Sequence, residues 1–358
     1  MNSERQNPYV EVIIPARNEQ ECIGRCLQSL VGQQGIDFQV TVVDDGSSDR
    51  THAVAESFAG VRVISSSEPA AGISGKCNAL IAAAQGSQAT WLLFTDADTF
   101  HYPGSLAAAI AEAEGRGVDL LSYSPEQQVV NWSEQMLMPV VFGDLTRAYP
   151  TDQVNDPTSP AAAANGQYLL VRRKVYEQLG GHRVVATKVL EDVELALLFK
   201  NSGRKIWFRY GGGLVQTRMY RSFSLLVEGW TKNLALLFRH TVVLAVLRLL
   251  EFIIIIGALI AGISSMIQHQ YPSGLALLAV SVIFYLRFLA RIGKAHFSWK
   301  PNLMAIFGLP LFGLLLLRSY FHARVRGLVT WKGRLYTHSE PVTPIKSSIQ
   351  EGNFTIKG

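Results

Sequence analysis

The chain contains 358 residues, of which 48% are hydrophobic and 17% are charged. This length is sufficient for one enzyme-sized domain and a second unit. The formal net charge of +5 is modest. Its basic residues gather near long apolar segments, which favours an anionic membrane surface and argues against nucleic acid as a partner. None of the three cysteines has the C-x-x-C spacing of a zinc or redox site.

The first 125 residues alternate between strand-like and helix-like segments. Hydrophobic periodicity predicts strands at residues 10–14, 38–43, 61–64, 91–95 and 118–123, and helices at residues 19–31, 48–58, 76–84 and 103–116. This alternation is typical of an α/β fold with a parallel, doubly wound sheet. Such sheets bind their ligands beyond the carboxyl ends of the strands.

Polar residues follow three of these strands at their carboxyl ends. They read PARNE at residues 15–19, DDGSSD at 44–49 and DAD at 96–98. In extended backbone, residues i and i+2 point to the same side, so Asp96 and Asp98 can face one divalent cation, Mg2+ or Mn2+. A D-x-D pair alone also fits an acidic surface turn. Three polar clusters at one edge of a sheet indicate a binding site instead.

The alternation fades after residue 126. Residues 149–160, YPTDQVNDPTSP, are predicted to form a mobile, turn-rich loop. Residues 165–182 indicate a strand followed by a helix, and residues 189–203 indicate a helix with Glu191 and Asp192 in its first turn. Carboxylates also occur at this position because they favour a helix N-terminus, so this pattern alone leaves their role open.

Two apolar segments, residues 242–267 and 272–290, are long enough to cross a membrane. Arg248 and Glu251 lie within the first, and their spacing of three residues allows them to pair on one helix face. No apolar signal-peptide segment follows Met1. We therefore expect a multi-pass protein of the cell membrane with a cytoplasmic N-terminal half.

A third apolar segment, residues 303–317, is only 15 residues long and contains Pro310 near its middle. A complete third crossing would also place the following basic residues outside the cell, against the positive-inside tendency. The segment is therefore predicted to be re-entrant or interfacial. The sequence WKGRLY at residues 331–336 would then return to the cytosolic face near the active site.

Five motifs occur in order: PARNE, DDGSSDRT, DAD, NGQ followed by RR, and ED at the start of a helix. Over residues 10–235 they resemble the family 2 inverting glycosyltransferases, which have the GT-A fold. The WKGRLY sequence resembles a box of the membrane-bound subgroup that glycosylates carotenoids and hopanoid-type lipids. The resemblance implies a Rossmann-like GT-A domain followed by membrane helices. It also implies a nucleotide-sugar donor, a divalent metal (Mg2+ or Mn2+) and a hydrophobic lipid acceptor.

The resemblance further implies roles for individual residues. Asp98, together with Asp96, would bind the metal, Asp96 would contact the ribose side of the nucleotide, and Asp192 would be the general base. The residues expected to bind the donor are Pro15, Arg17, Asn18, Glu19, Asp44, Asp45, Lys76 and Asp96. Those expected beside the acceptor or in auxiliary roles are Asn165, Gly166, Gln167, Glu191, Arg218, Arg221 and Trp230. A polar strand start is a weaker alternative for the NGQ motif, whereas a solvated, lipid-facing helix explains the last three residues equally well.

The predicted organisation is a GT-A catalytic domain at residues 1–215, an amphipathic interfacial segment at 216–240, a membrane region at 241–317, and a basic segment with the WKGRLY box at 318–358. The segment after Gln216 departs from the Q-x-x-R-W pattern of processive polysaccharide synthases. We therefore expect transfer of a single sugar, from a donor such as UDP-glucose, to a hydroxyl or carboxyl of a carotenoid or hopanoid.

Two alternatives remain open on the sequence. One is a sugar transferase of the same fold that acts on polyprenyl phosphate or a polysaccharide. The other is an inactive membrane module that only binds a nucleotide sugar. The presence of both DAD carboxylates and of Asp192 argues against the inactive module.

Overall fold

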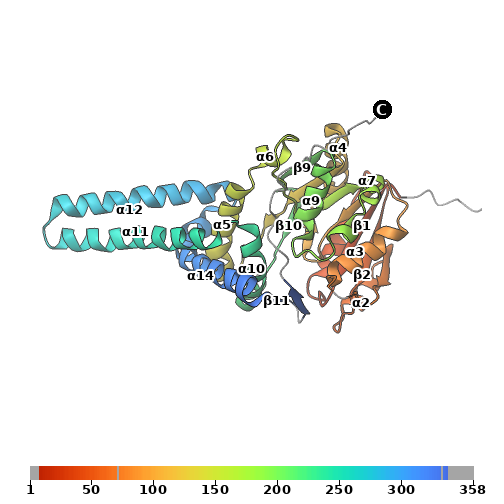
Figure 1. Ribbon diagram of the computed structural model, residues 1–358, viewed down its shortest axis with the longest axis horizontal. Helices are drawn as coiled ribbons and strands as arrows, with labels where there is room; N and C mark the ends of the chain where they lie inside the picture. Colours follow the sequence, from red (N-terminus) through yellow and green to blue (C-terminus); the bar gives the residue numbers. More distant parts are fainter. Residues whose placement is uncertain (1–7, 71, 332–333, 338–358) are drawn as a thin grey trace, which may run out of the picture.

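The computed structural model describes residues 8–70, 72–331 and 334–337. It has an N-terminal α/β domain from which a helical region with a long hairpin projects (Figure 1). The central sheet has seven strands, in the order β3 (Val61–Ser65), β2 (Phe38–Asp44), β1 (Val10–Ala16), β4 (Trp91–Phe94), β8 (Leu169–Arg172), β6 (Leu120–Ser124) and β9 (Ile206–Tyr210). The predicted α/β GT-A class is thereby confirmed.

One detail of the predicted sheet is wrong. Strand β8 runs antiparallel to both of its neighbours, β4 and β6, so the sheet is mixed. Leu169, at the start of β8, pairs with Phe94, at the end of β4. The chain therefore enters β8 from the edge where the parallel strands end. A short apolar strand carries no signal of its direction, so periodicity alone could not reveal this reversal.

Helices cover both faces of the sheet, and each face has its own hydrophobic core. The helices of this domain are α1 (Ile23–Val31), α2 (Thr51–Glu56), α3 (Gly75–Gly86), α4 (Ser105–Arg116), α5 (Trp132–Ala148), α6 (Thr151–Asn155), α7 (Arg173–Gln178), α8 (His182–Val185) and α9 (Glu191–Asn201). A small second sheet contains β5 (Thr99–His101), β10 (Val215–Thr217) and β7 (Glu126–Gln127).

Part of the predicted loop at residues 149–160 is helical, so that prediction is wrong for α6. Asn155, at the end of α6, explains why this turn is held in place. Its side chain donates to the carbonyl of Phe208 at 2.9 Å and accepts from the amide of Phe208 at 2.7 Å. These two bonds attach the helix to strand β9, a tertiary contact that local composition does not reveal.

The C-terminal region contains α10 (Phe223–Leu237), α11 (Thr241–Ile267), α12 (Tyr271–Ile292), α13 (Trp299–Met304) and α14 (Gly308–Phe321), with short 3-10 turns at Gly293–Ala295 and Ala305–Phe307 and a π-helical turn at His322–Arg326. Helices α11 and α12 form the projecting hairpin (Figure 1). Helices α10 and α14 contact α5 of the catalytic domain at its base. A third hydrophobic core joins these helices.

The predicted interruption of the third apolar segment at Pro310 is wrong. Helix α14 begins at Gly308, so Pro310 stands in its first turn, where the missing amide hydrogen removes no helical hydrogen bond. Among the described residues, three helical stretches are long and apolar enough to cross a membrane: Thr241–Ile267, Tyr271–Ala295 and Trp299–Arg326. The number of actual crossings stays a prediction, because only length and composition support it.

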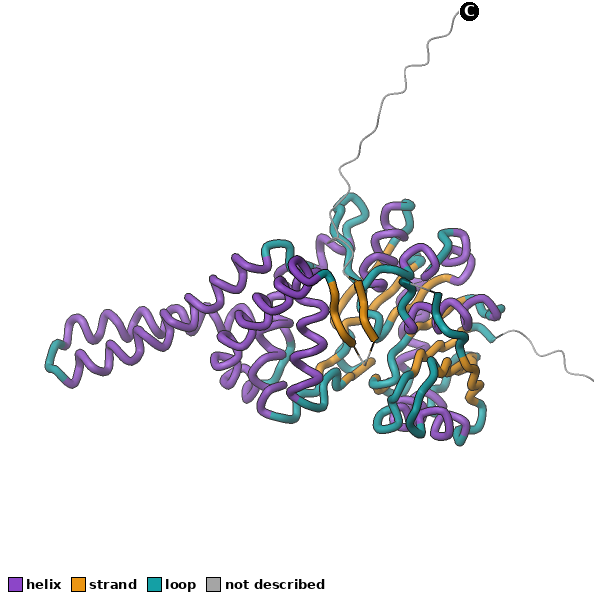
Figure 2. The backbone as a smooth tube through the Cα atoms, turned by 60° about the horizontal axis from the view of Figure 1, so that its bottom comes forward, coloured by secondary structure: helices purple, strands orange, loops and turns teal. Residues whose placement is uncertain are grey.

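Strands β11 (Leu328–Trp331) and β12 (Arg334–Thr337) form a hairpin that contains most of the WKGRLY box. Strand β11 contacts α10, and the hairpin lies between the helical region and the catalytic domain (Figure 2). Strand β11, which ends at the first residue of the box, is thus next to a helix that lines the pocket.

Four buried charges connect the projecting hairpin to the catalytic domain. Arg248 donates two hydrogen bonds to Asp144 of α5, at 2.7 and 2.8 Å, and a third to Glu251 at 2.8 Å. Arg291 of α12 closes the network with a hydrogen bond of 3.0 Å and an ion-pair contact of 2.8 Å to Glu251. The predicted pairing of Arg248 with Glu251 is confirmed. The two positive and two negative charges balance, which makes their burial tolerable.

Replacement of Arg248 with Met should destabilise the protein, because it leaves the Asp144 carboxylate buried without its main partner. Breaking a buried ion pair in this way costs about 3–5 kcal/mol. The thermal melting temperature in detergent should therefore fall. Arg287→Met, which removes an exposed arginine of α12, is the matched control and should leave melting unchanged. Equal melting of both variants would contradict a stabilising role for the network.

Candidate active site

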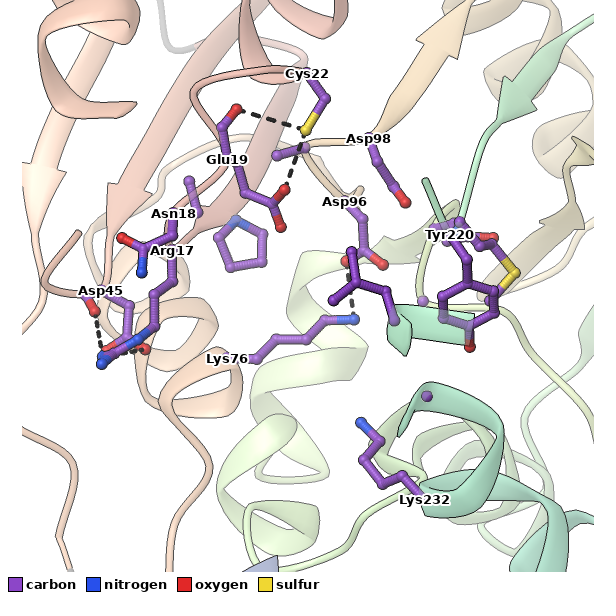
Figure 3. Close-up of a pocket in the computed structure, with 18 of the residues that line it drawn as sticks. Arg17, Asn18, Glu19, Cys22, Asp45, Lys76, Asp96, Asp98, Tyr220 and Lys232 are labelled. Carbon is purple, nitrogen blue, oxygen red and sulfur yellow. Dashed lines mark hydrogen bonds and ion pairs between the residues drawn. The ribbon is translucent and has the colours of Figure 1, made fainter. Parts of the chain in front are cut away.

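A pocket of about 620 Å³ lies beyond the carboxyl ends of β1, β2 and β4, where the sequence predicted a site. Among the predicted residues, those that line it are Pro15, Arg17, Asn18, Glu19, Asp45, Lys76, Asp96, Asp98, Asn165, Gly166, Gln167, Glu191, Asp192, Arg218 and Arg221. Figure 3 shows several of these side chains converging on the same space. Asp44 and Trp230 are not among the residues that line it.

The PARNE and DDGSSD loops form one end of the pocket and are joined to each other. The guanidinium of Arg17 donates to the carbonyl of Asp45 at 2.9 Å. The side-chain oxygen of Asn18 accepts from the amide of Ser48 at 2.9 Å. Asn18 has a φ of 54°, a left-handed conformation that asparagine tolerates better than most residues. The sequence therefore fixes both the shape and the polarity of this end.

Asp44 lies behind this wall. It is buried, and its carboxylate accepts from the amide of Ser47 at 3.1 Å. The neighbouring Asp45 faces the pocket, as expected for adjacent residues at the end of a strand, which point to opposite sides. Asp44 thus shapes the loop, and Asp45 is the member of the pair that is available to a ligand.

Lys76 joins two of the predicted motifs in the centre of the pocket. Its ammonium lies 2.9 Å from Asp96 of the DAD motif and 3.1 Å from Glu191 of the ED motif. Burial by itself lowers the pKa of Lys76, but these carboxylates outweigh it and raise the pKa overall. Lys76 is therefore a cation that holds two acidic groups in place.

Asp192 is held at the N-terminal end of α9. One carboxylate oxygen accepts from the amide of Gly166 at 2.8 Å, and the other accepts from the amide of Val193 at 2.8 Å. Burial, and then the negative charge of Glu191, raise the pKa of the Asp192 carboxyl to about 6. A carboxylate with such a pKa is a better proton acceptor at neutral pH than an ordinary aspartate.

A side chain at position 166 would crowd two groups of the pocket. A Cβ atom there would lie 3.0 Å from the ammonium of Lys76 and 3.5 Å from a carboxylate oxygen of Asp192. The glycine therefore allows the backbone to approach both groups closely. This geometry explains the NGQ motif better than a polar strand start does.

The Glu191 charge makes a testable contribution to the pH dependence of activity. Asp192 must be deprotonated to accept a proton, so activity should fall as the pH drops through about 6. Glu191→Gln removes the neighbouring charge that raises this pKa, and the acid limb of kcat/KM should move to lower pH. Glu194→Gln, in the same first helical turn, should leave the limb in place. A limb that stays fixed or moves upward in Glu191→Gln would contradict this electrostatic account.

The two DAD carboxylates fit a metal that a substrate helps to bind. Asp96 and Asp98 both line the pocket, whereas no cluster of three or more His, Cys, Asp or Glu side chains suited to a metal occurs within the described part of the chain. Mg2+ commonly uses one or two carboxylates and completes its coordination with water and substrate phosphates. Asp96 is paired with Lys76, and the role of Asp98 as the principal metal ligand stays a prediction.

Helix α10 forms the wall opposite the donor loops. Leu225, Gly229 and Lys232 line the pocket and share one helix face. Trp230 points elsewhere: it packs on Phe142 and Tyr220 in the helical core. Its predicted place beside a substrate was based on its residue type, whereas helical periodicity would have favoured Lys232.

Lys232 and Tyr220 are pocket residues that the sequence reasoning missed. The Lys232 side chain comes from α10 toward the region of Lys76 and Asp96 (Figure 3). Burial lowers the pKa of Lys232, and the negative charge of Glu191 partly opposes this effect. The ring of Tyr220 lies against Gly229, where a side chain would collide with it. The spacing 225, 229, 232 was the signal that could have identified this helix face.

The mixed sheet, the polar loops at its edge, and the carboxylates of the DAD and ED motifs define a glycosyltransferase of the GT-A type. Residues 11–180 match the family described as glycosyl transferase family 2. The chain is a family 2 glycosyltransferase. The resemblance that the motifs suggested is thus confirmed.

Similarity to known proteins extends over nearly the whole chain. It is 28% identical over 344 residues to a 4,4'-diaponeurosporenoate glycosyltransferase of Staphylococcus aureus strain MRSA252, covering 92% of this chain and 88% of the relative. The corresponding protein of strain USA300 is 26% identical over 343 residues, with the same coverage. In structure, the chain resembles a mannosyltransferase of Pyrobaculum calidifontis in complex with GDP-Man and Mn2+, with a TM-score of 0.53 and 15% identity over 90% of this chain and 88% of that one. This structural likeness supports the fold.

Proposed function

We propose that this enzyme transfers one sugar from a nucleotide donor, UDP-glucose, to a hydroxyl or carboxyl of a membrane lipid such as a carotenoid or hopanoid. One observation carries this proposal. The pocket that contains Asp192 has α10 as a wall, and α10 packs with its other face against α14, in a helical region long and apolar enough to cross a membrane. The catalytic domain would lie on the cytoplasmic face.

The S. aureus relative is named for 4,4'-diaponeurosporenoate as the molecule that it glycosylates. The similarity covers 88% of that protein and 92% of this chain, so it includes most of the helical region and not the catalytic domain alone. This coverage supports a lipid acceptor over a soluble one.

The proposed reaction is a single in-line displacement at the anomeric carbon. Asp192 accepts the proton of the acceptor hydroxyl while the acceptor oxygen forms a bond to the anomeric carbon. The bond from that carbon to the β-phosphate oxygen breaks, the nucleotide diphosphate leaves with the bonding electrons, and the configuration inverts. An acceptor carboxylate would attack without proton transfer.

The pocket residues divide this work between its two ends. The loops around Arg17 and Asp45 hold the nucleotide, and Lys76 keeps Asp96 and Glu191 in place. A divalent metal held by Asp98 and Asp96 would neutralise charge on the leaving diphosphate. Lys232, on the α10 wall, lines the same cavity.

Expression in a carotenoid-producing host tests this proposal. Lipid mass spectrometry should show a new species that is heavier than its acceptor by one hexose residue, and where the acceptor group is a hydroxyl, an Asp192→Asn variant expressed at the same level should produce far less of it. The absence of Q-x-x-R-W predicts no longer chain. Polysaccharide made by the purified enzyme would favour the polymer-forming alternative and contradict the proposal.

A further inference from the structure

Two exposed aromatic residues stand at the starts of α5 and α10. Trp132 and Phe223 stack with their ring centroids 5.7 Å apart and an angle of 25° between the rings. Trp132 is 58% exposed and Phe223 is 44% exposed, so the stacked pair as a whole faces outward. We call this pair the aromatic rim. Hydrophobic rings of this size are normally covered, which makes their exposure informative.

The rim is held rigidly by the caps of the two helices. The Asn131 side chain accepts from the amide of Glu134, and the Glu134 carboxylate accepts from the amide of Asn131, which forms a capping box on α5. Ser222 caps α10 by accepting from the amide of Leu225. The Asn131 side chain also donates to the carbonyl of Arg221, which connects the two helix starts. These hydrogen bonds therefore fix the aromatic rim in its exposed position.

The start of α10 places the aromatic rim close to the pocket. Leu225 follows Phe223 on α10, is 37% exposed, and lines the pocket. Met219 and Tyr220 line the same region, and Tyr220 lies against Gly229 farther along α10. A hydrocarbon chain that contacted Phe223 would thus lie within one helical turn of the pocket wall at Leu225.

The aromatic rim belongs to the helical region that supports the projecting hairpin. Helices α5 and α10 both contact α14, and the hairpin of α11 and α12 projects from this group (Figure 1). Tryptophan and other aromatic rings favour the level of the membrane interface, where one side meets lipid and the other meets water. The rim therefore has the chemistry expected of a lipid contact.

We propose that the aromatic rim receives the hydrocarbon part of the lipid acceptor and guides its polar end along α10 to Asp192. This inference rests on the proposed function, because it assumes that the acceptor is a lipid. It assigns Trp132 and Phe223 to acceptor capture and to no part of the chemical step. Donor binding and the chemistry at the anomeric carbon are independent of the rim.

Kinetics in vesicles of phosphatidylcholine and phosphatidylglycerol test this assignment. The double variant Trp132→Ser/Phe223→Ser should raise KM at least about tenfold for a carotenoid that carries one hydroxyl and resides in the bilayer, because the loss of aromatic contact weakens capture. The kcat, and the affinity for UDP in the presence of Mn2+, should stay unchanged. Trp299→Ser, which removes another exposed tryptophan of the helical region, is the matched control and should leave KM unchanged. An unchanged KM in the double variant, or an equal rise in the control, would overturn the assignment.

Fluorescence provides a measurement that does not depend on activity. Lipids brominated near the interface should quench the part of the tryptophan emission that disappears in Trp132→Phe. If that emission is not quenched, Trp132 does not meet the bilayer and the assignment is overturned. Loss of a dimer in the double variant, observed by sedimentation in detergent, would instead show that a second copy covers the rim. If the wild-type enzyme transfers no sugar to any lipid while Trp132 is quenched, the proposed function fails and the lipid contact stands.

Discussion

Replacement of Asp192 with Asn should reduce sugar transfer to a hydroxyl acceptor by about 100- to 10,000-fold, the usual contribution of a general base. The substitution preserves the shape of the side chain, and its remaining oxygen can still accept from the amide of Gly166. It removes the ability to accept a proton at pH 7. Donor and metal binding should therefore persist, and single-turnover kinetics should show that the loss lies in the chemical step.

Glu194→Gln provides the matched control for this variant. Glu194 lies in the same first turn of α9 but does not line the pocket, so its replacement should leave the rate near that of the parent enzyme. Binding of UDP should be measured for both variants by calorimetry in the presence of Mn2+. Transfer by Asp192→Asn at close to the parental rate would exclude Asp192 as the base.

Asp98→Ala should fail differently, because Asp98 is proposed to bind the metal that in turn helps to hold the donor diphosphate. UDP should lose the part of its affinity that depends on Mn2+, whereas binding in the presence of a chelator should change little. The measurement is a UDP titration with and without Mn2+. A loss of metal-dependent binding together with a loss of transfer would separate this residue from the general base.

Glu21→Ala controls for the removal of a carboxylate from the pocket. Glu21 lines the same cavity but is exposed and lies outside the DAD motif, so metal-dependent binding should be retained. If Asp98→Ala binds UDP with undiminished dependence on Mn2+, the metal does not require Asp98, and its assignment as a ligand fails.

The residues at the carboxyl ends of the strands were predictable because backbone geometry determines their position. Strands β1 and β4 are adjacent and parallel, so any polar residues that follow them must share an edge. The strands alternate with helices, and this pattern is visible in the sequence. The same logic correctly brought Asp98, Asp45 and Asn18 into one pocket.

Contacts between side chains that are distant in the sequence were harder to predict. The sequence predicted Lys76 as a donor-binding residue but did not reveal its pairing with Asp96 and Glu191, which lie 20 and 115 positions away along the chain. The antiparallel direction of β8 and the packing of α6 on β9 likewise depend on tertiary partners. Such partners carry no local periodic signal.

In the C-terminal region the sequence alone did not determine which helix face is buried or where a helix begins. Trp230 attracted attention because of its residue type, but its periodicity with Leu226 and Leu234 places it in the core. Pro310 predicts an interruption of the third apolar segment only if the helix begins well before it, and the sequence does not show that α14 begins at Gly308. A proline in the first turn is compatible with a continuous helix.

Reconstitution with a radiolabelled donor tests the central claim most directly. The purified enzyme in vesicles that contain a hydroxylated or carboxylated carotenoid should move label from UDP-glucose into the lipid phase. One sugar should be attached to each acceptor, with the anomeric configuration inverted relative to the donor. Label that enters only free glucose or a long polymer, or a product that retains the configuration of the donor, would contradict single inverting transfer to a membrane lipid.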